Sequence, residues 1–200
     1  MKKMILLSFL VLFVPVIVYG QDKVEAPVWN IGDKWRLTGD VTIMVVNADE
    51  SSYAVKYLTS GGASILINEK SSLNRLYAMD KDKRIPYEGR NKRLFHFPLN
   101  IGKSWSDKYH VSGKAGSQEY TETFTVLGWE DIVVQAGKFK AIKIEYKQEM
   151  IGQTAARSKE GKAWYWYSPD VKYMIKCQYE KSDYWDALYD WELTSFELKK

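Results

Sequence analysis

Residues 163–180 read AWYWYSPDVKYMIKCQYE, and this pattern decides the fold class of the chain. Pro169 fixes φ at a turn position and Asp170 is a common turn residue, so a tight turn is predicted there. From Val171 to Tyr179 every second residue is apolar or aromatic. The residues between them are polar except Met174, which is expected on the same outward face. A period of two is typical of a half-buried strand. The stretch therefore predicts two antiparallel strands joined by a turn.

The strand before this turn is aromatic on both faces. Trp164 and Trp166 alternate with Tyr165 and Tyr167, so each pair is expected on its own face. One face is predicted to cover a core, and the other is predicted to cover something other than an ordinary core.

The remainder of the chain has the same character. From Trp29 onward no sustained helical period is present, and short runs of β-branched and aromatic residues alternate with turn residues. Strands are expected near residues 41–46, 53–57, 64–67, 73–79, 94–99, 108–111, 121–129, 132–134, 139–148 and 185–198. About ten to twelve strands at hairpin spacing predict an all-β fold, namely an antiparallel curled sheet, barrel or sandwich.

The first twenty residues have the features of an export signal. Lys2 and Lys3 precede an apolar run at 4–18, and Val18-Tyr19-Gly20 fits a cleavage site. The run is shorter than the roughly 20 residues of a spanning helix, although an uncleaved anchor is the alternative. We expect a signal peptide at 1–20, one domain at 21–200 without a transmembrane span, and a periplasmic or secreted location.

Net charge and cysteine content limit which partners and covalent links are expected. The net charge of +4 includes Lys2 and Lys3, so the mature chain carries about +2 and gives no reason to expect a nucleic-acid partner. Cys177 is the only cysteine, which excludes an intrachain disulfide, and its place on the apolar face predicts a buried side chain. A monomer is expected.

No motif for catalysis, a metal or a cofactor is present. His96 and His110 are the only histidines, and Ser112 lacks the surroundings of a nucleophile. His96 is expected on a strand at a core edge. We therefore predict a non-enzymatic protein with no catalytic residue, no metal ligand and no cofactor.

Carboxylates beside tryptophans leave one enzymatic alternative. Glu130 and Asp131 follow Trp129, and the acids near the C-terminus are Asp183, Asp186 and Asp190. Paired carboxylates could support a glycan hydrolase.

The aromatic residues near the C-terminus are the candidate ligand site. They are Trp164, Trp166, Trp185, Trp191, Tyr165 and Tyr167. One interpretation is core and edge packing, and the other is an aromatic-lined groove for a lipid, a hydrophobic peptide or a glycan. A further alternative is an interaction module for another envelope protein, using these aromatics or the basic segment 80–93. That segment is otherwise expected to be a solvated hairpin loop.

Two turns are expected to depend on glycine. Residues 30–35 (NIGDKW) and 100–105 (NIGKSW) share Asn, Ile, Gly and Trp, which suggests two related halves or one strand-starting device used twice; we favour the second. Gly137 is expected to adopt a positive φ where 132–135 folds back on 139–144.

Three segments resemble a known group of proteins. FPLNIGKSW (97–105), LGWEDIVVQAGKFKAIKI (127–144) and WYSPDVKYMIK (166–176) are similar to bacterial exported all-β domains of unknown function labelled TapB-like. The resemblance covers about residues 94–180. It departs at Gln135 and Lys138, where the group often has Pro and Thr. It implies a curved antiparallel sheet in the cell envelope and supplies no active-site residues.

Overall fold

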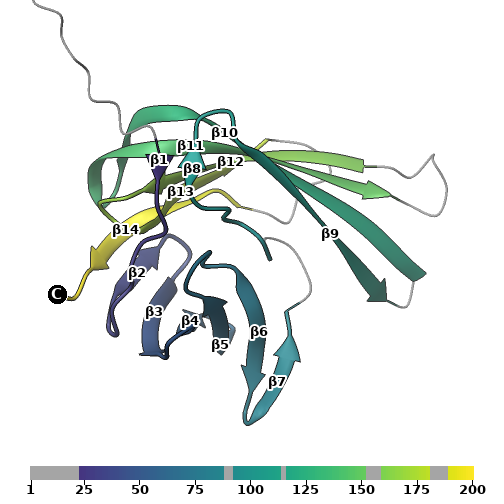
Figure 1. The fold of residues 1–200 in the computed structure, drawn as a ribbon, viewed down its shortest axis with the longest axis horizontal. Coiled ribbons are helices and arrows are strands. Elements are labelled where there is room, and N and C mark those ends of the chain that lie inside the picture. The colour runs from purple at the N-terminus through teal and green to yellow at the C-terminus, as the bar shows by residue number, and fades with distance from the viewer. Residues whose placement is uncertain (1–22, 88–91, 114–115, 152–158, 181–188) are drawn as a thin grey trace, which may run out of the picture.

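The computed structural model describes residues 23–87, 92–113, 116–151, 159–180 and 189–200, which form an all-β domain (Figure 1). The expected signal peptide at 1–20 and Trp185 lie outside these residues. The strands of the first half are β1 (Lys23–Val24), β2 (Lys34–Leu37), β3 (Val41–Ala48), β4 (Ser52–Thr59), β5 (Gly62–Glu69), β6 (Arg75–Asp80) and β7 (Lys83–Pro86). Those of the second half are β8 (Leu99–Asn100), β9 (Ser104–Gly113), β10 (Gly116–Val134), β11 (Gly137–Ile151), β12 (Lys159–Ser168), β13 (Tyr173–Tyr179) and β14 (Trp191–Glu197).

Twelve of these strands form one antiparallel sheet. Its order is β7-β6-β5-β4-β3-β2-β14-β13-β12-β11-β10-β9, and β1 pairs with β8 in a separate two-stranded sheet. The large sheet is two meanders, β2–β7 and β9–β14, which meet where β14 pairs with β2. Because β7 and β9 remain edges, the sheet is curled and is not a closed barrel (Figure 1). The prediction of an antiparallel curled sheet is confirmed.

A turn that contains a glycine with positive φ precedes the first strand of each meander. Gly32 and Gly102 have φ of 93° and 82°. The N–H of Gly32 donates to the Val45 carbonyl, and the N–H of Gly102 donates to the Val126 carbonyl, at 2.8 and 2.9 Å. Each valine N–H then donates back to the residue after the glycine, at 2.9 Å in both cases. One turn thus starts β2 and β9 alike.

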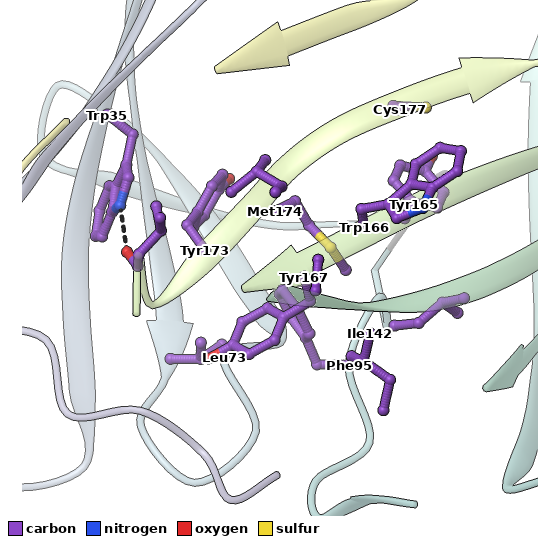
Figure 2. Close-up of a cluster of buried hydrophobic side chains, with 14 of the residues drawn as sticks. Trp35, Leu73, Phe95, Ile142, Tyr165, Trp166, Tyr167, Tyr173, Met174 and Cys177 are labelled. Carbon is purple, nitrogen blue, oxygen red and sulfur yellow. Dashed lines mark hydrogen bonds between the residues drawn. The ribbon is translucent and has the colours of Figure 1, made fainter. Parts of the chain in front are cut away.

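The predicted hairpin at 163–180 is present as β12 and β13. Two indoles hold the carbonyls of its turn: Trp35 Nε1 donates to Val171 O at 2.8 Å, and Trp29 Nε1 donates to Lys172 O at 2.9 Å. The Trp35 bond is the dashed line in Figure 2. Both donors come from the first half of the chain, so this turn ties the two meanders together.

The core fills the inside of the curled sheet. Phe124, Ile144, Tyr165, Ile175 and Cys177 are all at most 1% exposed, so the prediction for Cys177 is confirmed. Hydrophobic burial of this kind is the main stabilising term of such a fold.

Met174 corrects the predicted alternation, because it is also buried. The register of β12 with β13 shifts between Trp166 and Tyr167, which pair with Lys176 and Met174. Ile175 is therefore left between the paired positions, and Met174 turns inward beside Tyr167 (Figure 2).

Other predicted strands also differ. Residues 94–98 do not form a strand, and only Leu99 and Asn100 do. The backbone there is satisfied otherwise: Phe95 N donates to Asn74 Oδ1, and the Pro98 carbonyl accepts Lys103 Nζ.

The remaining differences concern strand length. Residues 121–129 and 132–134 are one strand, β10, with a shift in register between Val126 and Gly128. The expected strand at 185–198 is present as β14, which covers only Trp191–Glu197 within the described part. The described residues hold fourteen strands rather than ten to twelve, because the sequence pattern does not predict β1, β2 and β7. These strands have only two to four residues, too few to show a periodic pattern. β7 lies within residues 80–93, so the expectation of a solvated loop over that whole segment is wrong.

Candidate functional site

A cavity of about 550 Å³ lies in the interior of the curl, between the first and second meanders. Its apolar wall is built by side chains from β2, β3 and β13 and from the segment before β8: Leu37, Val41, Ile43, Met174 and Leu94. Its aromatic wall is Tyr57, Tyr165, Tyr173, Tyr179 and Trp191. Tyr189 also lines it and is 80% exposed, so the cavity reaches the surface there.

The structure brings only some of the predicted site residues together. Tyr165 and Trp191 both line the cavity, with ring centroids 6.4 Å apart. Tyr167 is buried deeper in the core, near Phe95 (Figure 2). Its ring makes T-shaped contacts with those of Phe95 and Phe97, with centroids 5.7 Å apart in each pair.

Trp164 and Trp166 belong to the opposite face of β12. Lys143 Nζ lies 5.9 and 5.0 Å from their ring centroids, and Lys162 and Lys176 lie over one ring each. Trp164 is partly exposed, whereas Trp166 is only 4% exposed beneath these lysine contacts, so this face carries cation–π pairs and does not line the cavity. The two tryptophans are therefore not part of the same site as Tyr165.

Glu130 lies on the same face as Trp166 and makes two hydrogen bonds there. Its carboxylate accepts Trp166 Nε1 at 2.7 Å and Lys143 Nζ at 3.1 Å. The Trp166 hydrogen bond, with help from Lys143, holds the pKa of Glu130 below its usual value. A carboxylate of this kind is ionised at neutral pH, so Glu130 is unsuited to the general-acid role that a glycan hydrolase needs.

Arg75, at the start of β6, is a cavity residue that the sequence analysis missed. Its Nη1 donates to Tyr87 Oη at 2.7 Å, and its Cζ lies 5.0 Å from the Tyr87 ring centroid and 5.7 Å from that of Tyr57. Burial opposes its charge, but the neighbouring tyrosines outweigh that effect and raise the pKa of Arg75. A permanently charged guanidinium thus lies in a cage of phenols.

Tyr173 completes this cage from the second meander. Its hydroxyl lies 3.3 Å from that of Tyr57, and its ring stacks on Trp35 at 4.9 Å. Burial, together with Tyr57, raises the pKa of Tyr173 well above its ordinary value although Arg75 acts in the opposite direction. Tyr173 is therefore a neutral phenol near pH 7.

A second polar cluster is buried between β9, β10 and β11. Tyr146 Oη donates to Glu122 Oε1 at 2.7 Å, and Gln148 Nε2 donates to Tyr109 Oη at 2.7 Å. Glu122 is fully buried. This cluster supports the long hairpin of β10 and β11 from within.

The histidines lie apart. His96 is exposed in the segment before β8, with its ring 5.9 Å from that of Trp105, rather than on a strand at a core edge. Burial, with Lys103 and Arg93, lowers the pKa of His96. His110 is on β9, 3.3 Å from a Glu119 oxygen.

The described residues lack two features. No group of three or more His, Cys, Asp or Glu side chains among them is placed to hold a metal ion. Within the same ranges no helix has the length and apolar character to cross a membrane.

Neither family models nor curated protein sequences match this chain, so the TapB-like resemblance is not confirmed. Some solved structures are similar to it. A candidate exported protein with a YmcC-like fold from Bacteroides fragilis has 12% identity and a TM-score of 0.49, covering 87% of this chain and 99% of its own. A candidate lipoprotein from Parabacteroides distasonis has 13% identity and a TM-score of 0.49, with coverages of 88% and 100%. The hypothetical lipoprotein YmcC from Escherichia coli has 10% identity and a TM-score of 0.45, with coverages of 86% and 90%. At these values the likeness supports no statement about the function of this chain.

Proposed function

We propose that this chain is a non-enzymatic exported envelope protein that binds an apolar or amphipathic molecule in the cavity between its two meanders. The observation that carries the proposal is the cavity itself. Folded cores leave few voids larger than a water molecule, yet this cavity, which opens to the surface at Tyr189, has a volume of about 550 Å³. That volume falls in the range of roughly 300–1,000 Å³ typical of ligand sites.

The residues that line the cavity support ligand binding, and the N-terminal segment supports export. Leu37, Val41, Ile43, Tyr165 and Trp191 all line the cavity, and such an apolar and aromatic lining favours the transfer of an alkyl chain or a ring from water into it. Residues 1–20 have the pattern of an export signal.

A neutral dye tests the cavity. N-phenyl-1-naphthylamine is expected to bind at micromolar concentration, with enhanced and blue-shifted emission, and to quench tryptophan fluorescence because Trp191 lines the site. Val41→Phe places a ring in the cavity and is expected to weaken dye binding about tenfold or more.

The matched control is Val133→Phe, since Val133 is 65% exposed on β10 and does not line the cavity. This variant is expected to bind the dye like the wild type. Equal dye binding by both variants would place the dye on the surface and contradict the proposal, as would the absence of binding by the wild type.

A further inference from the structure

The charge of the cavity is concentrated in two residues. Among the described residues that line it, only Arg75 and Asp190 are charged. Asp190 is exposed, and its Oδ1 already accepts the Tyr179 N–H at 2.8 Å. Water and this hydrogen bond therefore satisfy Asp190, which leaves Arg75 as the charge that a ligand would meet inside.

Arg75 has no anionic partner within the ranges that the structure describes. No carboxylate there lies within ion-pair distance of its guanidinium, and its contacts are the phenols of Tyr57 and Tyr87. Both it and Tyr57 are half-buried, and Tyr173 is a neutral phenol that is only 8% exposed. A partly buried cation with no carboxylate beside it is suited to an anion that arrives with the ligand.

The chemistry of the cage favours a carboxylate. A guanidinium is planar and binds the two oxygens of a carboxylate side by side. The hydroxyls of Tyr57 and Tyr173, 3.3 Å apart, add donors at the same end of the cavity. A phosphate, with its larger charge, would be left with only one cation here.

From this arrangement we infer that the cavity takes an amphipathic carboxylate, such as a fatty acid, with its head group at Arg75 and its chain along Leu37, Val41 and Ile43. This inference rests on the proposed function, because it names the class of ligand for the same cavity. Arg75 is then a ligand-binding residue, and the tyrosine cage holds its guanidinium in place.

Two probes of equal length separate head group from chain. Calorimetry of the full chain at pH 7.5 compares decanoate with decanol, which differ only at the head. Wild-type protein is expected to bind decanoate about tenfold or more tighter than decanol, because the charged hydrogen bonds to Arg75 are added to the same apolar contact.

Variants of Arg75 locate the preference. Arg75→Gln is expected to bind the two probes with nearly equal affinity, so that the preference for decanoate is lost. Arg75→Lys is expected to keep part of the preference, since it retains the charge and loses the planar fork. Arg84→Gln is the matched control: Arg84 also packs over a tyrosine ring, 5.1 Å from the centroid of Tyr77, but does not line the cavity.

The outcomes separate the two proposals. If both probes bind the wild type equally, or if Arg75→Gln keeps the preference, the inference about the carboxylate is overturned and the proposed cavity function remains. If neither probe binds, the proposed function falls and the inference falls with it. The wild-type preference is measured without any variant, and decanol binding reports whether Arg75→Gln is folded, so a folding defect does not obscure the result.

Discussion

The hydroxyl oxygens of Tyr57 on β4 and Tyr173 on β13 lie 3.3 Å apart and join the two meanders across the interior of the sheet. Tyr57→Phe removes this contact and leaves the buried Tyr173 hydroxyl with one partner fewer. We expect the free energy of unfolding in urea to fall by about 1–2 kcal/mol. Tyr189→Phe, at a ring that is 80% exposed, is the control and should change it by less than about 0.5 kcal/mol. A Tyr57→Phe variant as stable as wild type would show that this contact does not hold the halves together.

Two indole hydrogen bonds of equal length differ in burial, and we expect them to contribute differently to the free energy of unfolding. Trp35 Nε1 donates to Val171 O and Trp105 Nε1 donates to Arg93 O, each at 2.8 Å, but Trp35 is fully buried and the Trp105 bond is exposed. Trp35→Phe is expected to cost about 2–4 kcal/mol of unfolding free energy, because it leaves a buried carbonyl unpaired and a gap. Trp105→Phe should cost about 1 kcal/mol or less, since water replaces the donor. Equal losses would contradict the central place of the Trp35 bond.

Gly137 has φ of 138°, which confirms the predicted turn between β10 and β11. A Cβ there would meet the Phe139 ring at 3.7 Å, an ordinary contact, so the cost of a side chain comes from the backbone alone. Gly137→Ala is expected to lower the unfolding free energy by about 1 kcal/mol or more. Gly61→Ala is the control, because Gly61 has no positive φ and open space beyond Thr59 Oγ1 at 3.6 Å. The expectation fails if both variants lose the same stability.

Asp49 makes part of the stability dependent on pH. The Ser52 hydroxyl and the N–H groups of Ser51 and Ser52 hold the pKa of Asp49 at about 2. Because the folded pKa is lowered, its contribution is complete above the unfolded pKa of about 4 and is lost as pH falls toward about 2. Urea unfolding at pH 5 should therefore separate wild type from Asp49→Asn, and at pH 2 the two should nearly coincide. An unchanged difference at pH 2 would exclude Asp49 as a source of the acid sensitivity.

The sequence pattern was enough to predict the local elements. The alternation from Val171 to Tyr179 predicted β13, and the shared Asn-Ile-Gly pattern predicted one turn used twice, which Gly32 and Gly102 confirm with matching hydrogen bonds. The buried state of Cys177 followed from the same alternation. These features depend on neighbours along the chain, so the chain alone reveals them.

The cavity could not be predicted in the same way. Tyr57, Arg75 and Tyr173 lie on three strands that meet only because the sheet curls, and nothing near Arg75 in the sequence distinguishes it from a surface arginine. Trp164 and Tyr165 were grouped because they are adjacent in sequence, although adjacent residues of a strand occupy opposite faces. Aromatic content therefore indicated a candidate site, whereas the curl decides which aromatic residues share it.

The most direct measurement is a crystal structure of the protein grown with decanoate. We expect electron density for the alkyl chain of decanoate between Leu37 and Trp191, with its carboxylate about 3 Å from the Arg75 guanidinium nitrogens. Side chains filling the cavity, with decanoate bound elsewhere or not at all, would contradict this expectation.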